Sequence, residues 1–152
     1  AAEIGAVSAD HLMAVSDKGI RAMAESNVIA TLLPGTTLFL GKHQYALGRK
    51  LIDNGVEVAI ATDFNPGSCT LLSIPIIMSL ATLYCGLTID ESFKAVTYNA
   101  AKTLKRDNIL GMIKEGYQAD LIFWNIRNLE EIPYWFGSDR ILTVMKKGQL
   151  LD

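Results

Sequence analysis

The sequence predicts an α/β fold built around parallel strands, and three observations support this prediction. Short apolar segments at 28–33 and 56–62 have the β-branched composition of buried strands, and a shorter candidate lies at 7–12. The connections between them carry helical patterns and are long enough for right-handed crossovers. The segment at 56–62 ends at Asp63, and α/β sheets and barrels place functional side chains at the carboxyl ends of such strands.

Two roles are open for Asp63 from these residues alone. Its carboxylate can act in catalysis or bind a metal at the end of the strand. It can equally accept backbone N–H groups in the loop that contains Pro66 and Gly67, as aspartates often do after strands.

The N-terminal elements follow in order. Residues 1–6 have the pattern of a last helical turn that closes on Gly5, and the strand at 7–12 has a polar tip at Asp10-His11. A lone histidine such as His11 is more often a surface or core residue than a ligand. Ser16 can cap a helix at about 17–26.

The connection between the second and third strands is predicted to hold a loop and a helix. The loop covers 36–41, and the helix lies near 43–53, where Leu47 and Leu51 are one helical turn apart. Asn54-Gly55 ends this helix. His43 is predicted to be exposed and to have no function.

The C-terminal half changes character after Asp63. A helix at 72–85 is apolar on nearly all sides, and Thr88 with Glu91 has the spacing of a capping box that opens another helix. The predicted buried stripe of that helix consists of Ile89, Phe93, Val96, Ala100 and Leu104. Beyond Asn108 the patterns at 121–124, 133–136 and 141–151 favour strands, with alternation too short for a sheet of their own.

Composition excludes several function classes. The chain has 152 residues, 16 acidic and 14 basic, with a net charge of −2, so no basic face points to nucleic acid or to a membrane surface. The apolar stretch at 71–84 is too short to span a bilayer. Cys69 and Cys85 form neither a metal-binding pair nor a disulfide framework, which fits a reducing, cytoplasmic compartment.

Several ordered segments give the sequence a family resemblance. The more specific segments are Ser8-Ala9-Asp10-His11-Leu12, Leu33-Pro34-Gly35-Thr36-Thr37, Ala61-Thr62-Asp63-Phe64-Asn65-Pro66-Gly67-Ser68 and Ile132-Pro133-Tyr134. Two less specific segments are Thr97-Tyr98-Asn99-Ala100-Ala101-Lys102 and the one at 111–121. By these segments the sequence resembles the imidazolonepropionase family over nearly its whole length; the last two are shared by the amidohydrolase superfamily at large.

The resemblance implies a metal-dependent (β/α)8 TIM barrel with a small β domain built from both ends of the chain. The three predicted strands then correspond to strands six, seven and eight of the barrel. Residues 1–107 correspond to a partial barrel domain, and residues 108–152 to the C-terminal share of the small β domain.

The activity implied by the resemblance is hydrolysis of 4-imidazolone-5-propanoate to N-formimino-L-glutamate in histidine degradation. A divalent metal, zinc or iron, is the implied cofactor, and a small molecule is the implied substrate. Carried over by resemblance, Asp63 is a metal ligand and catalytic residue, and His11 is a catalytic residue beside the metal. Asn65, Gly67 and Ser68 match a loop that contacts substrate or product, although ordinary turn chemistry also explains Asn65 and Ser68.

The sequence also departs from this family. The His-x-His pair of the first strand and the histidine of the fifth are missing, and His11 and His43 are the only two histidines. A catalytic zinc site usually takes three protein ligands, and a TIM barrel takes roughly 250 residues. The resemblance therefore implies the C-terminal part of such an enzyme, inactive alone and not retaining metal.

Exposed strand edges lead us to expect a homo-oligomer, or association with the missing N-terminal part. Two other interpretations stay open. One is another metal-dependent amidohydrolase, such as a deaminase or a cyclic-amide hydrolase. The other is a non-catalytic, self-associating half-barrel module.

Overall fold

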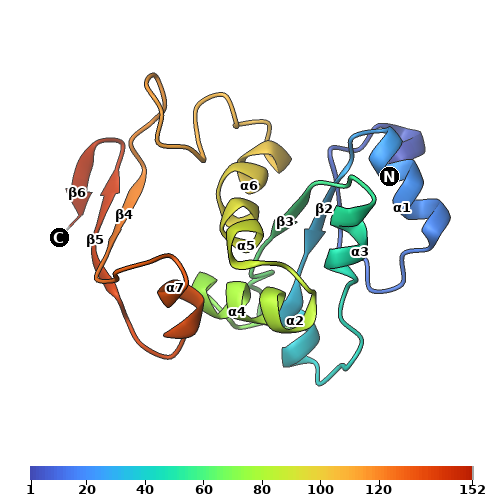
Figure 1. Ribbon diagram of the computed structural model, residues 1–152, viewed down its shortest axis with the longest axis horizontal. Coiled ribbons are helices and arrows are strands. Elements are labelled where there is room, and N and C mark those ends of the chain that lie inside the picture. The colour runs from blue at the N-terminus through green and yellow to red at the C-terminus, as the bar shows by residue number, and fades with distance from the viewer. Residues whose placement is uncertain (152) are drawn as a thin grey trace.

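The computed structural model describes residues 1–151, which contain two three-stranded sheets with helices between them (Figure 1). The parallel sheet has the order β1 (Ser8–Asp10), β2 (Ile29–Leu32) and β3 (Val58–Ile60). The antiparallel sheet has the order β4 (Leu121–Trp124), β5 (Ile141–Lys146) and β6 (Gln149–Leu151). The described helices are η1 (Ala2–Ile4), α1 (Asp17–Glu25), α2 (Pro34–Phe39), α3 (Gly48–Asp53), α4 (Ile74–Tyr84), α5 (Ile89–Val96), α6 (Tyr98–Thr103) and α7 (Glu131–Tyr134).

The parallel sheet confirms the predicted strand order and direction. Ala30 of β2 lies opposite Ala9 of β1 and Val58 of β3, and Leu32 lies opposite Ile60. The face that carries these residues packs against the helices. Its core includes the almost fully buried side chains of Ile20, Leu32, Leu51, Ile77 and Met78.

Two predicted helix starts are confirmed by their hydrogen bonds. Ser16 Oγ accepts from the backbone N–H of Gly19 over 3.1 Å at the start of α1. At the start of α5, Thr88 Oγ1 accepts from the N–H of Glu91, and the Glu91 carboxylate accepts from the N–H of Thr88, which is the predicted capping box.

The connection after β2 differs from the prediction. Residues 36–41 were predicted as a loop, yet most of them belong to α2, because Pro34 at the first helical turn has a backbone angle already suited to a helix. The helix predicted near 43–53 begins only at Gly48. A Cβ at Gly48 would lie 2.7 Å from the Cys85 carbonyl oxygen, so the backbone at Gly48 packs closely against the backbone at Cys85. His43 is exposed, as predicted.

The predicted buried stripe after residue 88 is wrong. The backbone breaks at Thr97, which separates α5 from α6 and interrupts the helical period. Leu104 is 70% exposed, whereas Asn99 is buried and donates from Nδ2 to the carbonyl oxygen of Val58 over 2.7 Å. The buried residues of α5 and α6 are Ser92, Ala95, Asn99 and Ala101.

Two predictions for the C-terminal segment are wrong. The segment forms a sheet of its own, although both faces are largely exposed, which explains the weak alternation. Lys147 and Gly148 have φ angles of 51° and 79°, as a tight hairpin between β5 and β6 requires. Residues 133–136 were predicted as a strand, but Pro133 lies in the short helix α7.

Helix α7 joins this segment to the rest of the molecule. Ile132 is 4% exposed and belongs to the main core, and Ser79 Oγ of α4 donates to the Pro133 carbonyl oxygen over 2.6 Å.

Cys69 and Cys85 are buried free thiols, without a disulfide. Within residues 1–151, none of the helices has the length and apolar character needed to cross a membrane.

Candidate active site

Three polar side chains follow the carboxyl ends of the three parallel strands. His11 comes directly after β1, and its backbone N–H donates to the Thr31 carbonyl oxygen over 3.0 Å, which continues the sheet pairing by one residue. Thr36 lies in the first turn of α2 after β2, and Asp63 comes shortly after β3. Because the strands are parallel, these three residues meet at one edge of the sheet.

Asp63 is the centre of this group. Its Oδ2 atom accepts a hydrogen bond from Thr36 Oγ1 over 2.6 Å and lies 3.9 Å from Nε2 of His11. The side chain of Asp63 is 29% exposed and that of His11 is 44% exposed. The Asp63 side chain is therefore mostly shielded from solvent but remains accessible in part.

The backbone at this edge adopts uncommon angles. His11, Leu12 and Asp63 have φ angles of 69°, 63° and 53°, in the left-handed region that only a few per cent of non-glycine residues occupy. For a bulky residue such as Leu12 this conformation is an outlier. Such strain gathers at functional sites, where the surrounding structure maintains it, so the geometry favours a functional role for this edge.

The loop after Asp63 is organised by Asn65. Its Nδ2 donates to the Asp63 carbonyl oxygen over 2.8 Å, and its Oδ1 accepts from the N–H groups of Gly67 and Ser68 over 2.9 and 2.8 Å. The Ser68 hydroxyl lies 2.9 Å from Asn65 Nδ2 and 3.1 Å from Asn65 Oδ1. Asn65 and Ser68, which were predicted to contact substrate, thus make the hydrogen bonds of an ordinary turn.

The structure brings Asp63 and His11 together, as the resemblance implies, and adds Thr36. Thr36 was not among the predicted site residues, although its segment is part of the family resemblance. One signal was present: Thr36 follows the Pro34-Gly35 pair that ends the second parallel strand, so its side chain had to lie near the same sheet edge as Asp63.

Carboxylate and imidazole groups suit a divalent zinc or iron ion, so Asp63 and His11 fit as part of a metal site. Three candidate ligands are not brought together. No group of three His, Cys, Asp or Glu side chains within residues 1–151 is close enough to hold a metal ion. The chemistry of the donors fits a metal, but the number of donors in this part of the chain is short of a complete set.

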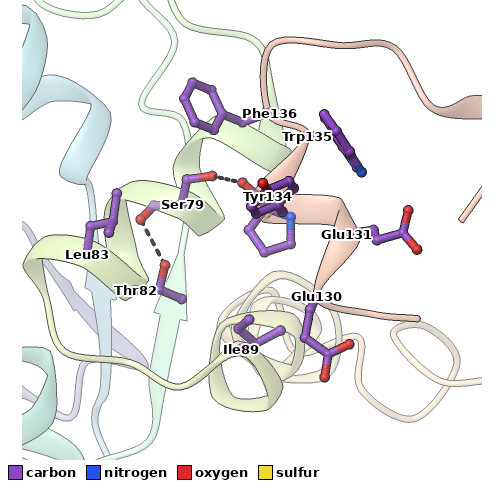
Figure 2. A pocket seen from close by; sticks show the side chains of 10 residues that line it. Ser79, Thr82, Leu83, Ile89, Glu130, Glu131, Tyr134, Trp135 and Phe136 are labelled. Atoms are coloured by element: carbon purple, nitrogen blue, oxygen red, sulfur yellow. Dashed lines mark hydrogen bonds between the residues drawn. The ribbon is translucent and has the colours of Figure 1, made fainter. Parts of the chain in front are cut away.

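A groove of about 600 Å³ lies elsewhere, between α4 and α7 (Figure 2). Apolar side chains such as Leu83 and Trp135 line it, and Glu130 and Glu131 stand on its α7 side. None of the residues at the strand ends contributes to it. We therefore take the sheet edge at Asp63, and not this groove, as the candidate active site.

The sequence pattern of the amidohydrolase family matches residues 3–151. The chain belongs to the amidohydrolase family. Among curated relatives, the amidohydrolase chain is 51% identical over 150 residues to imidazolonepropionases of Bacillus cytotoxicus and Bacillus anthracis. Each match covers 99% of this chain and 36% of the relative, so the chain spans about a third of those proteins.

Solved amidohydrolase structures show the same fold. A zinc-bound adenosine deaminase from Xanthomonas campestris superposes with a TM-score of 0.83 at 21% identity, over 94% of this chain and 36% of that one. Guanine deaminase from Escherichia coli gives 0.79 at 20% identity, over 95% and 39%. The predicted fold class is confirmed: this is a portion of the amidohydrolase TIM barrel, followed by strands of a small β unit.

Proposed function

We propose that this amidohydrolase chain carries part of the active site of an imidazolonepropionase, which hydrolyses 4-imidazolone-5-propanoate to N-formimino-L-glutamate in histidine degradation. The observation that carries the proposal is the 51% identity to imidazolonepropionases across 99% of the chain. The geometry at Asp63 supports it, because a carboxylate and an imidazole at one sheet edge suit hydrolysis of a cyclic amide.

We propose that the whole protein uses a divalent metal, zinc or iron, with Asp63 among its ligands and His11 beside it. Such an ion lowers the pKa of a bound water and polarises a carbonyl group. A catalytic zinc site usually takes three protein ligands, and residues 1–151 bring no such group together. The remaining ligands are then supplied from outside the described residues.

Asp63 and His11 have distinct roles in the proposed reaction. Water adds to the ring carbonyl carbon, and the bond from that carbon to the ring nitrogen breaks. The Asp63 carboxylate takes the proton from the attacking water and later delivers it to the leaving nitrogen. His11, 3.9 Å from Asp63 Oδ2, orients the water or stabilises the developing oxyanion.

We retain Asn65, Gly67 and Ser68 as proposed substrate contacts, with a constraint from the loop. The amide of Asn65 and the N–H of Gly67 already have partners within the loop. A substrate group that binds either one must share or replace such a partner. The proposed role of Asn65 is therefore first to shape the loop.

We also propose that this chain associates with itself. In the described sheet, β1 and β3 each pair on one side only, and an edge strand can pair with another chain. Light scattering on the purified chain should find an oligomer, and a sharply unfolding monomer would contradict this.

We also propose that residues 1–107 and 108–152 form two domains. A cytoplasmic location is proposed because the two buried cysteines are free thiols.

The test of the proposed function is a substrate panel with the native protein that contains this sequence, hereafter the native protein. It should turn over 4-imidazolone-5-propanoate in preference to adenosine, guanine and other cyclic amides. Preference for an aminopurine would replace the proposed substrate by that of a deaminase. Absence of hydrolysis across the panel by metal-loaded protein would overturn the proposal.

A further inference from the structure

We infer that Thr36 is a positioning residue, which holds the Asp63 carboxylate in the orientation that metal binding and proton transfer need. This inference rests on the role proposed for Asp63 and extends it to the helix after β2. Its basis is the 2.6 Å hydrogen bond that Thr36 Oγ1 donates to Asp63 Oδ2. Hydroxyl donors bind a carboxylate over such short distances when the acceptor is ionised.

Thr36 is itself held firmly in place. It is 6% exposed, and its backbone N–H donates to the Leu33 carbonyl oxygen. A Cβ at the preceding Gly35 would lie 2.7 Å from Ile77 Cδ1 and 3.2 Å from Cys69 Sγ, so the first turn of α2 packs directly against α4 and the loop. The hydroxyl is therefore presented by a rigid element.

Asp63 needs such a partner because its own backbone does not determine the direction of its side chain. It has a left-handed φ of 53° and stands outside β3, with its carbonyl oxygen held by Asn65. Thr36 holds one carboxylate oxygen. Within residues 1–151 the other oxygen, Oδ1, accepts no hydrogen bond, which leaves it for a metal or a water. Groups that orient a metal ligand in this way typically contribute 10- to 100-fold to metal affinity or activity.

Thr37 offers a matched control. It follows Thr36 in α2 and is also buried, at 4% exposure. The hydrogen bond to Asp63 Oδ2 comes from Thr36, and within residues 1–151 the Thr37 hydroxyl makes none to Asp63. Replacing either threonine by valine keeps the volume and removes only the hydroxyl group.

The experiment compares Thr36→Val, Thr36→Ser and Thr37→Val in the native protein, by metal affinity in chelator competition and by kcat and KM. We expect Thr36→Val to lose about 10- to 100-fold in metal affinity and in kcat, with KM little changed. Thr36→Ser should remain within a few-fold of the wild type, and Thr37→Val should equal it. Unchanged metal affinity and kcat in folded Thr36→Val, or an equal loss in Thr37→Val, would overturn the inference.

Two further comparisons keep the result unambiguous. Where Thr36→Val does not fold, Thr36→Ala and Thr36→Ser lack the same methyl group and differ only in the hydroxyl, so equal metal affinities would overturn the inference. Where the native protein binds metal but does not hydrolyse 4-imidazolone-5-propanoate, a loss of metal in Thr36→Val still supports the positioning role. The proposed substrate alone then fails.

Discussion

Nε2 of His11 and Oδ2 of Asp63 lie 3.9 Å apart, although the two residues follow different strands and both have left-handed backbones. Two strand ends that are distant in sequence thus converge on one point. A base and an electrophilic or orienting group at this separation can act on the same water or carbonyl. This pair leads to the first two predictions.

Asp63→Asn in the native protein should lower kcat/KM by about 10²- to 10⁴-fold, because the amide cannot take up a proton and binds metal weakly. Asp53→Asn is the matched control. Asp53 is the last residue of α3, which precedes β3, so it lies near the start of β3 and Asp63 lies beyond its end. The side chain of Asp53 is 61% exposed. Steady-state kinetics at equal metal loading measure both. Near-normal turnover by Asp63→Asn would remove its assigned role.

His11→Asn should reduce kcat by about 10²- to 10³-fold with little change in KM, as expected when a group that stabilises developing charge is lost. Asparagine tolerates the left-handed backbone better than most residues, so the fold around position 11 should be kept. His43→Asn, at the exposed second histidine, should leave kcat unchanged. A comparable loss in both variants would argue against a specific role for His11.

Gly48→Ala should destabilise the native protein by about 1–3 kcal/mol, because the added methyl group overpacks a buried contact. Its Cβ would lie 2.5 Å from Leu87 Cδ1 and 2.7 Å from the Cys85 carbonyl oxygen. Gly137→Ala is the control, since its Cβ would meet nothing within 4 Å. Its effect should stay within about 0.5 kcal/mol in denaturant titrations. Equal effects at both positions would contradict this packing argument.

The C-terminal hairpin should respond to acid through Asp120. Hydrogen bonds from Lys146 and from the Lys147 N–H lower the pKa of Asp120 from 3.8 to about 2. A lowered folded-state pKa means that the stabilisation is present above the ordinary value and is lost as the pH falls through about 2. The difference in unfolding midpoint between wild type and Asp120→Asn should therefore shrink between pH 4 and pH 2.

Lys146→Gln provides the control for this pH dependence. Because Lys146 is the largest cause of the lowered pKa of Asp120, its loss should remove most of the change between pH 4 and pH 2. The same slope with and without Lys146 would assign the acid response to another group.

The 152-residue chain should not retain stoichiometric zinc or iron after dialysis against a mild chelator. Its described residues place only His11 beside Asp63, and no third candidate ligand joins them. Elemental analysis measures the retained metal, and Asp63→Asn should not change the small residual amount. One tightly held ion per chain would instead indicate a site shared between copies.

Periodicity and capping signals allowed most of the barrel portion to be predicted. The strands at 28–33 and 56–62 were evident because both faces of a parallel strand are apolar, and the caps at Ser16 and Thr88 depend only on neighbouring residues. Predictions failed where tertiary contacts prevail over local pattern. Asn99 is buried because it satisfies a strand carbonyl, which no helical period can indicate.

The residues of the candidate site also differ in how far the sequence alone indicates them. Asp63 is recognisable from sequence because a single carboxylate ends an apolar strand. His11 needed the family resemblance, since one histidine in a loop carries little information. The sequence places Thr36 close after the end of a strand, but its bond to Asp63 became evident only from the 2.6 Å distance, because that bond depends on the direction of one hydroxyl.

The contact between Asn99 and Val58 affects which of the two sheet edges is open to another strand. Glu57 and Ala61 pair with β2, so the Val58 carbonyl points to the outer edge of β3, where an incoming strand would bind. Asn99 Nδ2 already occupies that acceptor, and β3 is almost fully buried. A strand from another molecule would have to displace this amide before it could pair. Helix α6, which carries Asn99, thus protects the outer edge of β3 from pairing with another strand and leaves β1 as the more open edge.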